Sequence, residues 1–142
     1  MATLDYQQLV EAAGDGIVVC DAGGAIVVWN GACERIFGFT KDDAMGKSLD
    51  LIIPERQRQR HWDGYHKTMG TGETRYGSDV LRVPALHKDG RTLSIAFTVA
   101  MTHTPDGKVA AIAAVIRDET VRWGEERQLR NRLAQLEAAA AA

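Results

Sequence analysis

The feature that most constrains the fold is a strict alternation of large apolar residues with small or polar residues over positions 93–101. The large residues are Leu93, Ile95, Phe97, Val99 and Met101, and those between them are Ser94, Ala96, Thr98 and Ala100. Successive side chains of a β-strand point to opposite faces, so this period of two predicts a strand with one face against a core. The chain should therefore contain a sheet and is not a plain helical bundle.

Further strands are predicted on both sides of this run. Residues 74–85 and 109–116 flank it, and the connections His87-Lys88-Asp89-Gly90 and Pro105-Asp106-Gly107 favour turns, which predicts an antiparallel meander. Earlier in the chain, β-branched residues surround the pair Gly23-Gly24, which predicts a hairpin. Together these strands predict one five-stranded antiparallel sheet.

Helices are predicted before, between and after the strands. Residues 31–51 read as short helices, and Thr40-x-x-Asp43 resembles a capping box. Pro54 should open a longer helix that reaches about residue 69 and ends at Gly70-Thr71-Gly72. An amphipathic helix with Thr3 as its N-cap should precede the sheet.

The end of the chain predicts a coiled-coil-like exit helix. Leu129, Leu133 and Leu136 follow four-three spacing within a charged stretch, as in a short a/d seam. The predicted organisation has three parts: an N-terminal amphipathic helix at 1–13, a domain built on the sheet at 14–120, and an exit helix with an Ala-rich tail at 121–142. The fold class is α+β.

Composition excludes several classes of function. The 142 residues carry 17 Lys+Arg and 19 Asp+Glu, a formal net charge of −2, whereas a nucleic-acid binder needs a basic surface. The two cysteines form neither a disulfide framework nor a zinc site. Because no apolar run reaches the roughly 18 residues of a membrane span, we expect a cytoplasmic protein without membrane insertion.

Enzyme motifs are incomplete in this sequence. Residues 14–16 lack the third glycine of a dinucleotide-binding loop, and residues 46–50 lack the second glycine of a nucleophile elbow. His61 and His66 would lie about 140° apart around a helix, so they do not bind one metal ion from one face. We therefore expect that the chain is not an enzyme.

Short motifs along most of the chain occur in the order seen in PAS domains. They are Asp15-Gly16-Ile17-Val18-Val19, Trp29-Asn30-x-Ala32, Phe37-Gly38-Phe39, Gly46-Lys47, Pro54-Glu55, Gly72-Glu73, Lys88-Asp89-Gly90 and Arg117-Asp118-Glu119-Thr120. The sequence from about residue 9 to residue 120 thus resembles the PAS family. This resemblance implies that residues 14–120 form a sensory or interaction module, with the short helices over one face of the sheet and a ligand held between them. It also implies that the module performs no catalysis itself.

A helix histidine is the candidate cofactor ligand. The segment Pro54-Glu55-x-x-x-x-Arg60-His61-x-Asp63-Gly64-Tyr65 resembles the haem-binding PAS domains of rhizobial oxygen-sensor kinases, where a histidine on this helix ligates the iron. The resemblance implies that His61 binds haem b, with His66 as second candidate, and that an open iron position binds O2, CO or NO. The residues that it implies around the pocket are Phe97, Val99, Ile112, Ala114 and Leu81.

The sequence departs from those haem-binding relatives beside the expected gas site. Their gas-contacting arginine corresponds to Leu81, while Arg82 falls on the opposite face and Asp79 stands where they have an apolar residue. The reactive cysteine of the flavin photosensors is missing from residues 46–49. Two alternatives to haem remain: a cofactor-free dimerisation or interaction module, and a module that binds another small ligand or flavin.

Asp118 and Thr120 are the candidate residues for signal transmission. Asp118-x-Thr120 resembles the junction that couples PAS domains to an exit helix, where Asp and Thr bond backbone groups at the change from strand to helix. A strand shift caused by gas binding or a redox change would then alter the helix direction. We expect a homodimer formed through both terminal helices and the outer sheet face, and a downstream effector domain such as a histidine kinase.

Overall fold

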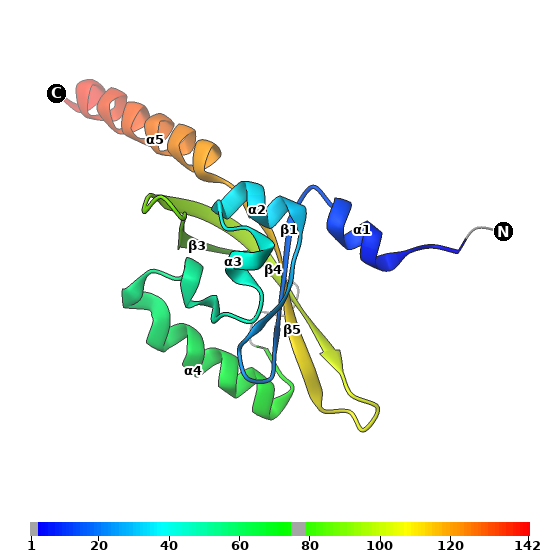
Figure 1. The fold of residues 1–142 in the computed structure, drawn as a ribbon. Helices are drawn as coiled ribbons and strands as arrows, with labels where there is room; N and C mark the ends of the chain where they lie inside the picture. The colour runs from blue at the N-terminus through cyan, green and yellow to red at the C-terminus, as the bar shows by residue number, and fades with distance from the viewer. Residues whose placement is uncertain (1–2, 75–78) are drawn as a thin grey trace.

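The computed structural model describes residues 3–74 and 79–142 (Figure 1). Its elements in chain order are α1 (Tyr6–Ala12), β1 (Gly16–Asp21), β2 (Ile26–Trp29), α2 (Gly31–Phe37), α3 (Lys41–Ala44), the 3-10 helix η1 (Leu49–Ile52), α4 (Glu55–Thr71), β3 (Leu81–Leu86), β4 (Thr92–His103), β5 (Val109–Asp118) and α5 (Thr120–Ala141). The five strands form one antiparallel sheet in the order β2-β1-β5-β4-β3. The predicted α+β class and five-stranded sheet are confirmed.

The sheet buries one face, as the alternation over residues 93–101 predicts. Leu93 and Ile95 of β4 are 2% and 4% exposed, and Phe97 lies opposite Leu81 on one side and Ile116 on the other. These residues pack against side chains of α2, α3, η1 and α4, so the helices cover this inner face. Of the first predicted meander strand, residues 75–78 lie outside the described residues, and the described strand begins at Leu81.

Local sequence signals explain most helix ends. Gly38 ends α2 with φ +79°, in the left-handed region that favours glycine. Thr40 and Asp43 form the predicted capping box at α3, and α4 lies between Pro54 and Gly72. The Thr3 cap is wrong, because the Asp5 side chain accepts a 3.1 Å hydrogen bond from the Gln8 amide and α1 begins only after it.

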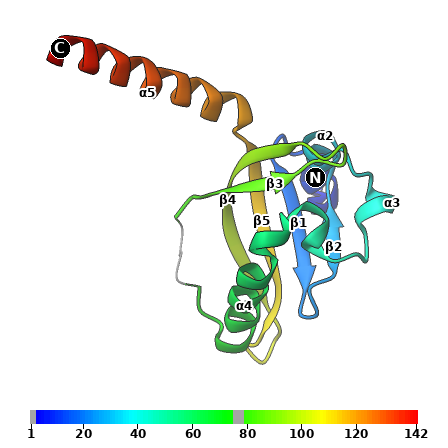
Figure 2. The same cartoon turned by 90° about the vertical axis from the view of Figure 1, so that its left-hand side faces the viewer.

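The exit helix α5 leaves the sheet at the end of β5 and projects away from the rest of the protein (Figures 1 and 2). Leu129, Leu133 and Leu136 are 57–69% exposed on it. None of the helices in the described ranges is both long and apolar enough to cross a membrane. The leucine seam of α5 is thus left uncovered by the described part of the chain.

Candidate functional site

The inward face of α4 carries side chains spaced three and four residues apart. Among them, Trp62 and Tyr65 pack against the core formed with the sheet. The Tyr65 hydroxyl donates a hydrogen bond to the Asp21 carbonyl, and Trp62 Nε1 donates to Asp50 Oδ1 at 2.7 Å. These bonds join α4 to β1 and to η1, so the helix is held over the sheet and lies against β5 (Figure 2).

A glycine in the β1–β2 turn allows this close approach of α4. Gly24 has φ +85°, and a Cβ atom placed on it would lie 2.7 Å from the Trp62 ring. An L side chain at this position would meet both backbone strain and a steric clash. The Gly23-Gly24 pair thus does more than form the predicted turn, since it also makes room for the indole.

His61 lies on the inward face of α4 and is half-buried. Its ring meets the Trp62 ring edge-on at a centroid distance of 4.6 Å, and its Nδ1 is buried with no hydrogen-bond partner in the described part of the chain. Burial lowers the pKa of His61 below its usual value; Asp50 opposes this effect and His66 adds to it. The ring is therefore neutral near pH 7, the form that ligates a metal.

His66 has a different environment. It is exposed, and its ring lies 6.1 Å from that of Trp62. With Trp62 it lines an open depression of about 340 Å³ whose other lining residues are Gly23, Gly24, Ala25, Gly46 and Ser48. The structure thus separates the two histidines, with His61 toward the core and His66 on an outer surface.

The predicted pocket residues share the inner face of the sheet. Phe97, Ile112 and Ala114 pack against the core, while Val99 lies opposite Ala114 and Leu81 lies opposite Phe97. All five are half-buried. Arg82 lies opposite Ala96 on the other face and is exposed, as the sequence predicts, and Asp79 is exposed as well.

The potential metal ligands in the described part of the chain do not gather into a cluster. No group of three or more His, Cys, Asp or Glu side chains is placed to hold a metal ion in residues 3–74 and 79–142. Burial raises the pKa of Cys20 to about 11 and that of Cys33 to about 12, so both stay protonated thiols. The neutral imidazole of His61 is of the type that could hold a metal as a single protein ligand.

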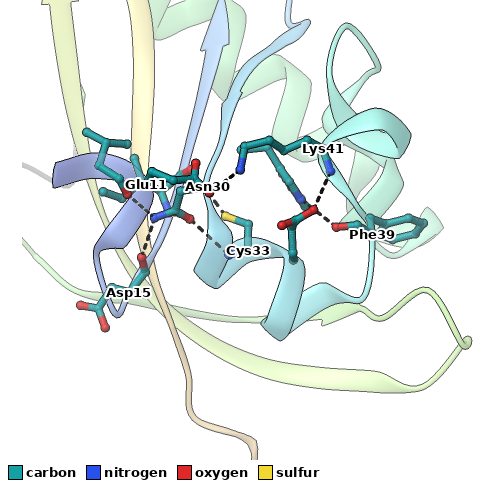
Figure 3. A network of polar contacts seen from close by, with 10 residues as sticks. Glu11, Asp15, Asn30, Cys33, Phe39 and Lys41 are labelled. Carbon is teal, nitrogen blue, oxygen red and sulfur yellow. Dashed lines mark hydrogen bonds and ion pairs between the residues drawn. The ribbon is translucent and has the colours of Figure 1, made fainter. Parts of the chain in front are cut away.

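The buried side chain of Asn30 holds three segments of the chain together. From the sequence alone it can be identified only as a turn or cap residue. It is 0% exposed, and its Oδ1 accepts hydrogen bonds from the amides of Ile17 at 2.9 Å and Cys33 at 3.2 Å (Figure 3). Its Nδ2 donates to the carbonyls of Val10 at 2.8 Å and Asp15 at 3.0 Å. One side chain thereby joins α1, the start of β1 and the start of α2.

The exit junction is held by the two predicted residues together with Ser94. Asp118 Oδ1 accepts from the Thr120 amide at 2.9 Å, and Thr120 Oγ1 accepts from the Ser94 amide at 3.0 Å. The Glu119 amide donates to the Ser94 carbonyl at 2.8 Å. The start of α5 is thus bonded to the backbone of β4, a contact that the sequence does not reveal.

The chain is similar in sequence to two proteins named as sensors and to one named as uncharacterized. The chain is 33% identical over 122 residues to an uncharacterized protein of Azorhizobium caulinodans, which covers 85% of this chain and 16% of that protein. It is 27% identical over 124 residues to the sensor protein FixL of Bradyrhizobium diazoefficiens, covering 87% and 23% of the two chains. For the oxygen sensor protein DosP of Escherichia coli, the identity is 24% over 115 residues, covering 81% and 14%.

The fold and a family model give the same assignment. The crystal structure of a PAS domain from Colwellia psychrerythraea matches with a TM-score of 0.70 at 21% identity, covering 81% of this chain and 94% of that one. A family model described as PAS fold matches residues 4–118. The chain spans less than a quarter of the length of the three sequence relatives above. With this fold, these motifs and this match over most of its length, the chain belongs to the PAS family.

Proposed function

We propose that this chain is the sensory module of a cytoplasmic signalling protein that binds haem b through His61 and responds to O2, CO or NO, or to redox state. The observation that carries the proposal is the neutral ring of His61 on the inward face of α4, with a buried nitrogen that no described residue bonds. The similarity to an oxygen sensor protein and to a sensor protein supports it.

The residues proposed for the pocket fit such a group chemically. His61 Nε2 would hold the iron, and Phe97, Val99, Ile112, Ala114 and Leu81 on the inner face of the sheet would form an apolar wall that excludes water. Haem, when bound, would supply an iron position for a diatomic gas. The chain itself would only bind and orient, so we propose no catalytic activity for it.

We propose that the signal leaves through α5 of a homodimer. Asp118 and Thr120 connect β5 to α5, so a displacement of the sheet would change the direction of the helix. The exposed leucines of α5 suit a seam with a second copy, and Leu4 before α1 and Leu9 within it are exposed as well. The outer-face residues predicted for the interface are Ser94, Ala96, Thr98 and Ala100.

The proposed organisation keeps the three predicted parts, at residues 1–13, 14–120 and 121–142. Because the related proteins are more than three times as long as this chain, a downstream effector domain is part of the proposal. The second candidate function is a cofactor-free dimerisation module. The exposed α5 seam favours it, because that seam needs a partner whether or not a ligand is bound.

A titration with haem tests the function directly. The purified chain should give a Soret band that saturates with added haem, and His61→Ala should lose it. His66→Ala is the matched control on the same helix and should keep the band. If wild type gives no band at any haem concentration, the haem proposal is wrong and the dimerisation module is favoured. A band that survives in His61→Ala but not in His66→Ala would show that His66, on the outer surface, is the haem ligand.

A further inference from the structure

Two buried polar atoms without hydrogen-bond partners lie one helical turn apart on α4. They are Gln57 Oε1 and His61 Nδ1, and no other buried side-chain nitrogen or oxygen among the described residues lacks a partner. Both side chains are half-buried. Buried polar groups are nearly always hydrogen-bonded, so two exceptions on one helix need a common explanation.

The spacing of the two residues lets them meet. Residues four apart on a helix are neighbours on its surface, with Cβ atoms about 5–6 Å apart. The atoms are chemically complementary, because an amide oxygen only accepts hydrogen bonds and a protonated Nδ1 only donates them. They are not bonded to each other in the structure, and rotation of the long Gln57 side chain about its own torsions is what would bring them together.

We propose that Gln57 is a positioning residue for His61: its side-chain oxygen accepts a hydrogen bond from Nδ1–H and so leaves the lone pair on Nε2. A neutral imidazole carries one proton, and a bond that holds it on Nδ1 makes Nε2 the basic nitrogen. Histidines that ligate metals usually donate their other N–H to an oxygen in this way. The inference rests on the proposed function only in naming haem iron as the group that Nε2 would meet.

The surroundings of Gln57 favour this pairing over others. Gln59, two residues on, is exposed and donates from its Nε2 to Asp63 Oδ1 at 2.9 Å. The nearby Arg58 is already bonded to the carbonyls of Ile53 and Asp50. His61 and Gln57 are thus the two described side chains of this helix whose buried polar atoms are unpaired.

The tautomer of His61 in the haem-free chain tests the inference without any cofactor. Imidazole ¹⁵N spectra, recorded where the ring is neutral, should show wild-type His61 protonated on Nδ1. Gln57→Leu should shift the population toward Nε2–H, and Gln57→Glu, which keeps an acceptor oxygen, should retain Nδ1–H. Gln59→Leu is the matched control and should leave the His61 signals unchanged. Circular dichroism and urea midpoints identify any variant that fails to fold.

A haem titration of the same variants adds a second measurement. Gln57→Leu should weaken haem binding by about 10- to 100-fold, and Gln59→Leu should leave it unchanged. An Nε2–H tautomer in wild type, or one that does not respond to Gln57→Leu, would overturn the inference. A tautomer that responds in a chain that binds no haem would support the role of Gln57 and refute the haem proposal, so the two failures can be told apart.

Discussion

Two sets of polar side chains in the described part of the chain differ in how their buried atoms are paired. At Asn30 both ends of the carboxamide are paired, with two backbone amides donating to it and two carbonyls accepting from it. On the inward face of α4, Gln57 and His61 each bury an atom that has no partner among the described residues. The buried polar atoms of Asn30 are all hydrogen-bonded, and those of Gln57 and His61 are not.

This difference separates what holds the fold together from what is available for binding. A buried hydrogen bond contributes about 0.5–1.5 kcal/mol, whereas a buried group left without one costs about 1–3 kcal/mol. A protein retains such a cost where a ligand or a conformational change removes it. The Asn30 cluster should therefore dominate stability, and the α4 face should dominate binding.

The largest expected effect is that of Asn30→Ala. The substitution removes four hydrogen bonds and leaves buried backbone groups of three chain segments unpaired. Unfolding free energy from urea titration should fall by about 2–4 kcal/mol. A loss below about 1 kcal/mol would contradict the central role given to Asn30 and would remove the contrast with α4.

Asn30→Asp divides the same cluster into two halves. The carboxylate can still accept from the amides of Ile17 and Cys33, but it cannot donate to the carbonyls of Val10 and Asp15. The loss should be about 1–2 kcal/mol. Hydrogen exchange should speed up in α1 and at residues 13–15, while the start of α2 stays protected. Equal loss of protection in both places would show that the two halves act as one unit.

His61→Leu should have a smaller effect of opposite sign at pH 7. It replaces a half-buried ring, whose Nδ1 is unpaired, with an apolar side chain of similar volume. The haem-free variant should be equal to wild type or up to about 1 kcal/mol more stable in urea. A clear destabilisation would mean that His61 contributes to the fold and that the comparison with Asn30 is mistaken.

The pH dependence of stability gives a further measure of His61. Because its pKa in the folded state lies below the unfolded value of about 6.5, the unfolded chain binds more protons as the pH falls below 6.5. The contribution of neutral His61 to the free energy of unfolding is thus fully present above pH 6.5. It is lost as the pH falls through the pKa that His61 has in the folded state. The urea midpoint of wild type should fall more steeply from pH 7 to pH 5 than that of His61→Leu. Parallel curves for the two proteins would contradict the stated burial.

The smallest effect is expected where polar contacts lie at the surface. Arg117 donates to both carboxylate oxygens of Asp15 at 3.3 Å, and its side chain is 68% exposed. Exposed ion pairs contribute little and are screened by salt. Arg117→Gln should leave the urea midpoint unchanged at physiological salt, as should the equally exposed control Arg122→Gln. If the urea midpoint falls strongly in Arg117→Gln but not in Arg122→Gln, the surface ion pair of Asp15 and Arg117 belongs to the stabilising cluster around Asn30.

Periodic patterns predict the scaffold of this protein well. The alternation over residues 93–101 identifies β4 and its buried face because a strand has a period of two whatever surrounds it. Caps are local too, and Thr40 with Asp43 was identifiable from spacing alone. Where two good caps stand close together, as Thr3 and Asp5 do, local preference cannot choose between them.

The candidate site is less predictable because burial and pairing depend on tertiary structure. His61 could be selected from a motif, yet the missing partner of its Nδ1 becomes visible only when the neighbouring elements are in place. Nothing in the sequence marks Gln57 as part of a site, because a glutamine among several polar helix residues is expected to face solvent. Ser94 contributes backbone atoms to the exit junction, and backbone contacts leave no residue-type signature.

The pairing of β1 with β5 has a consequence for how such a sensor can be combined with other proteins. Gly16 at the start of β1 lies opposite Ile116 near the end of β5, so the chain enters and leaves the sheet side by side. A unit whose two ends are adjacent can be inserted into a host chain without stretching or rerouting it. Transplanting residues 14–120 between two helices of an unrelated signalling protein would therefore require matching only the helical phase at the two joints.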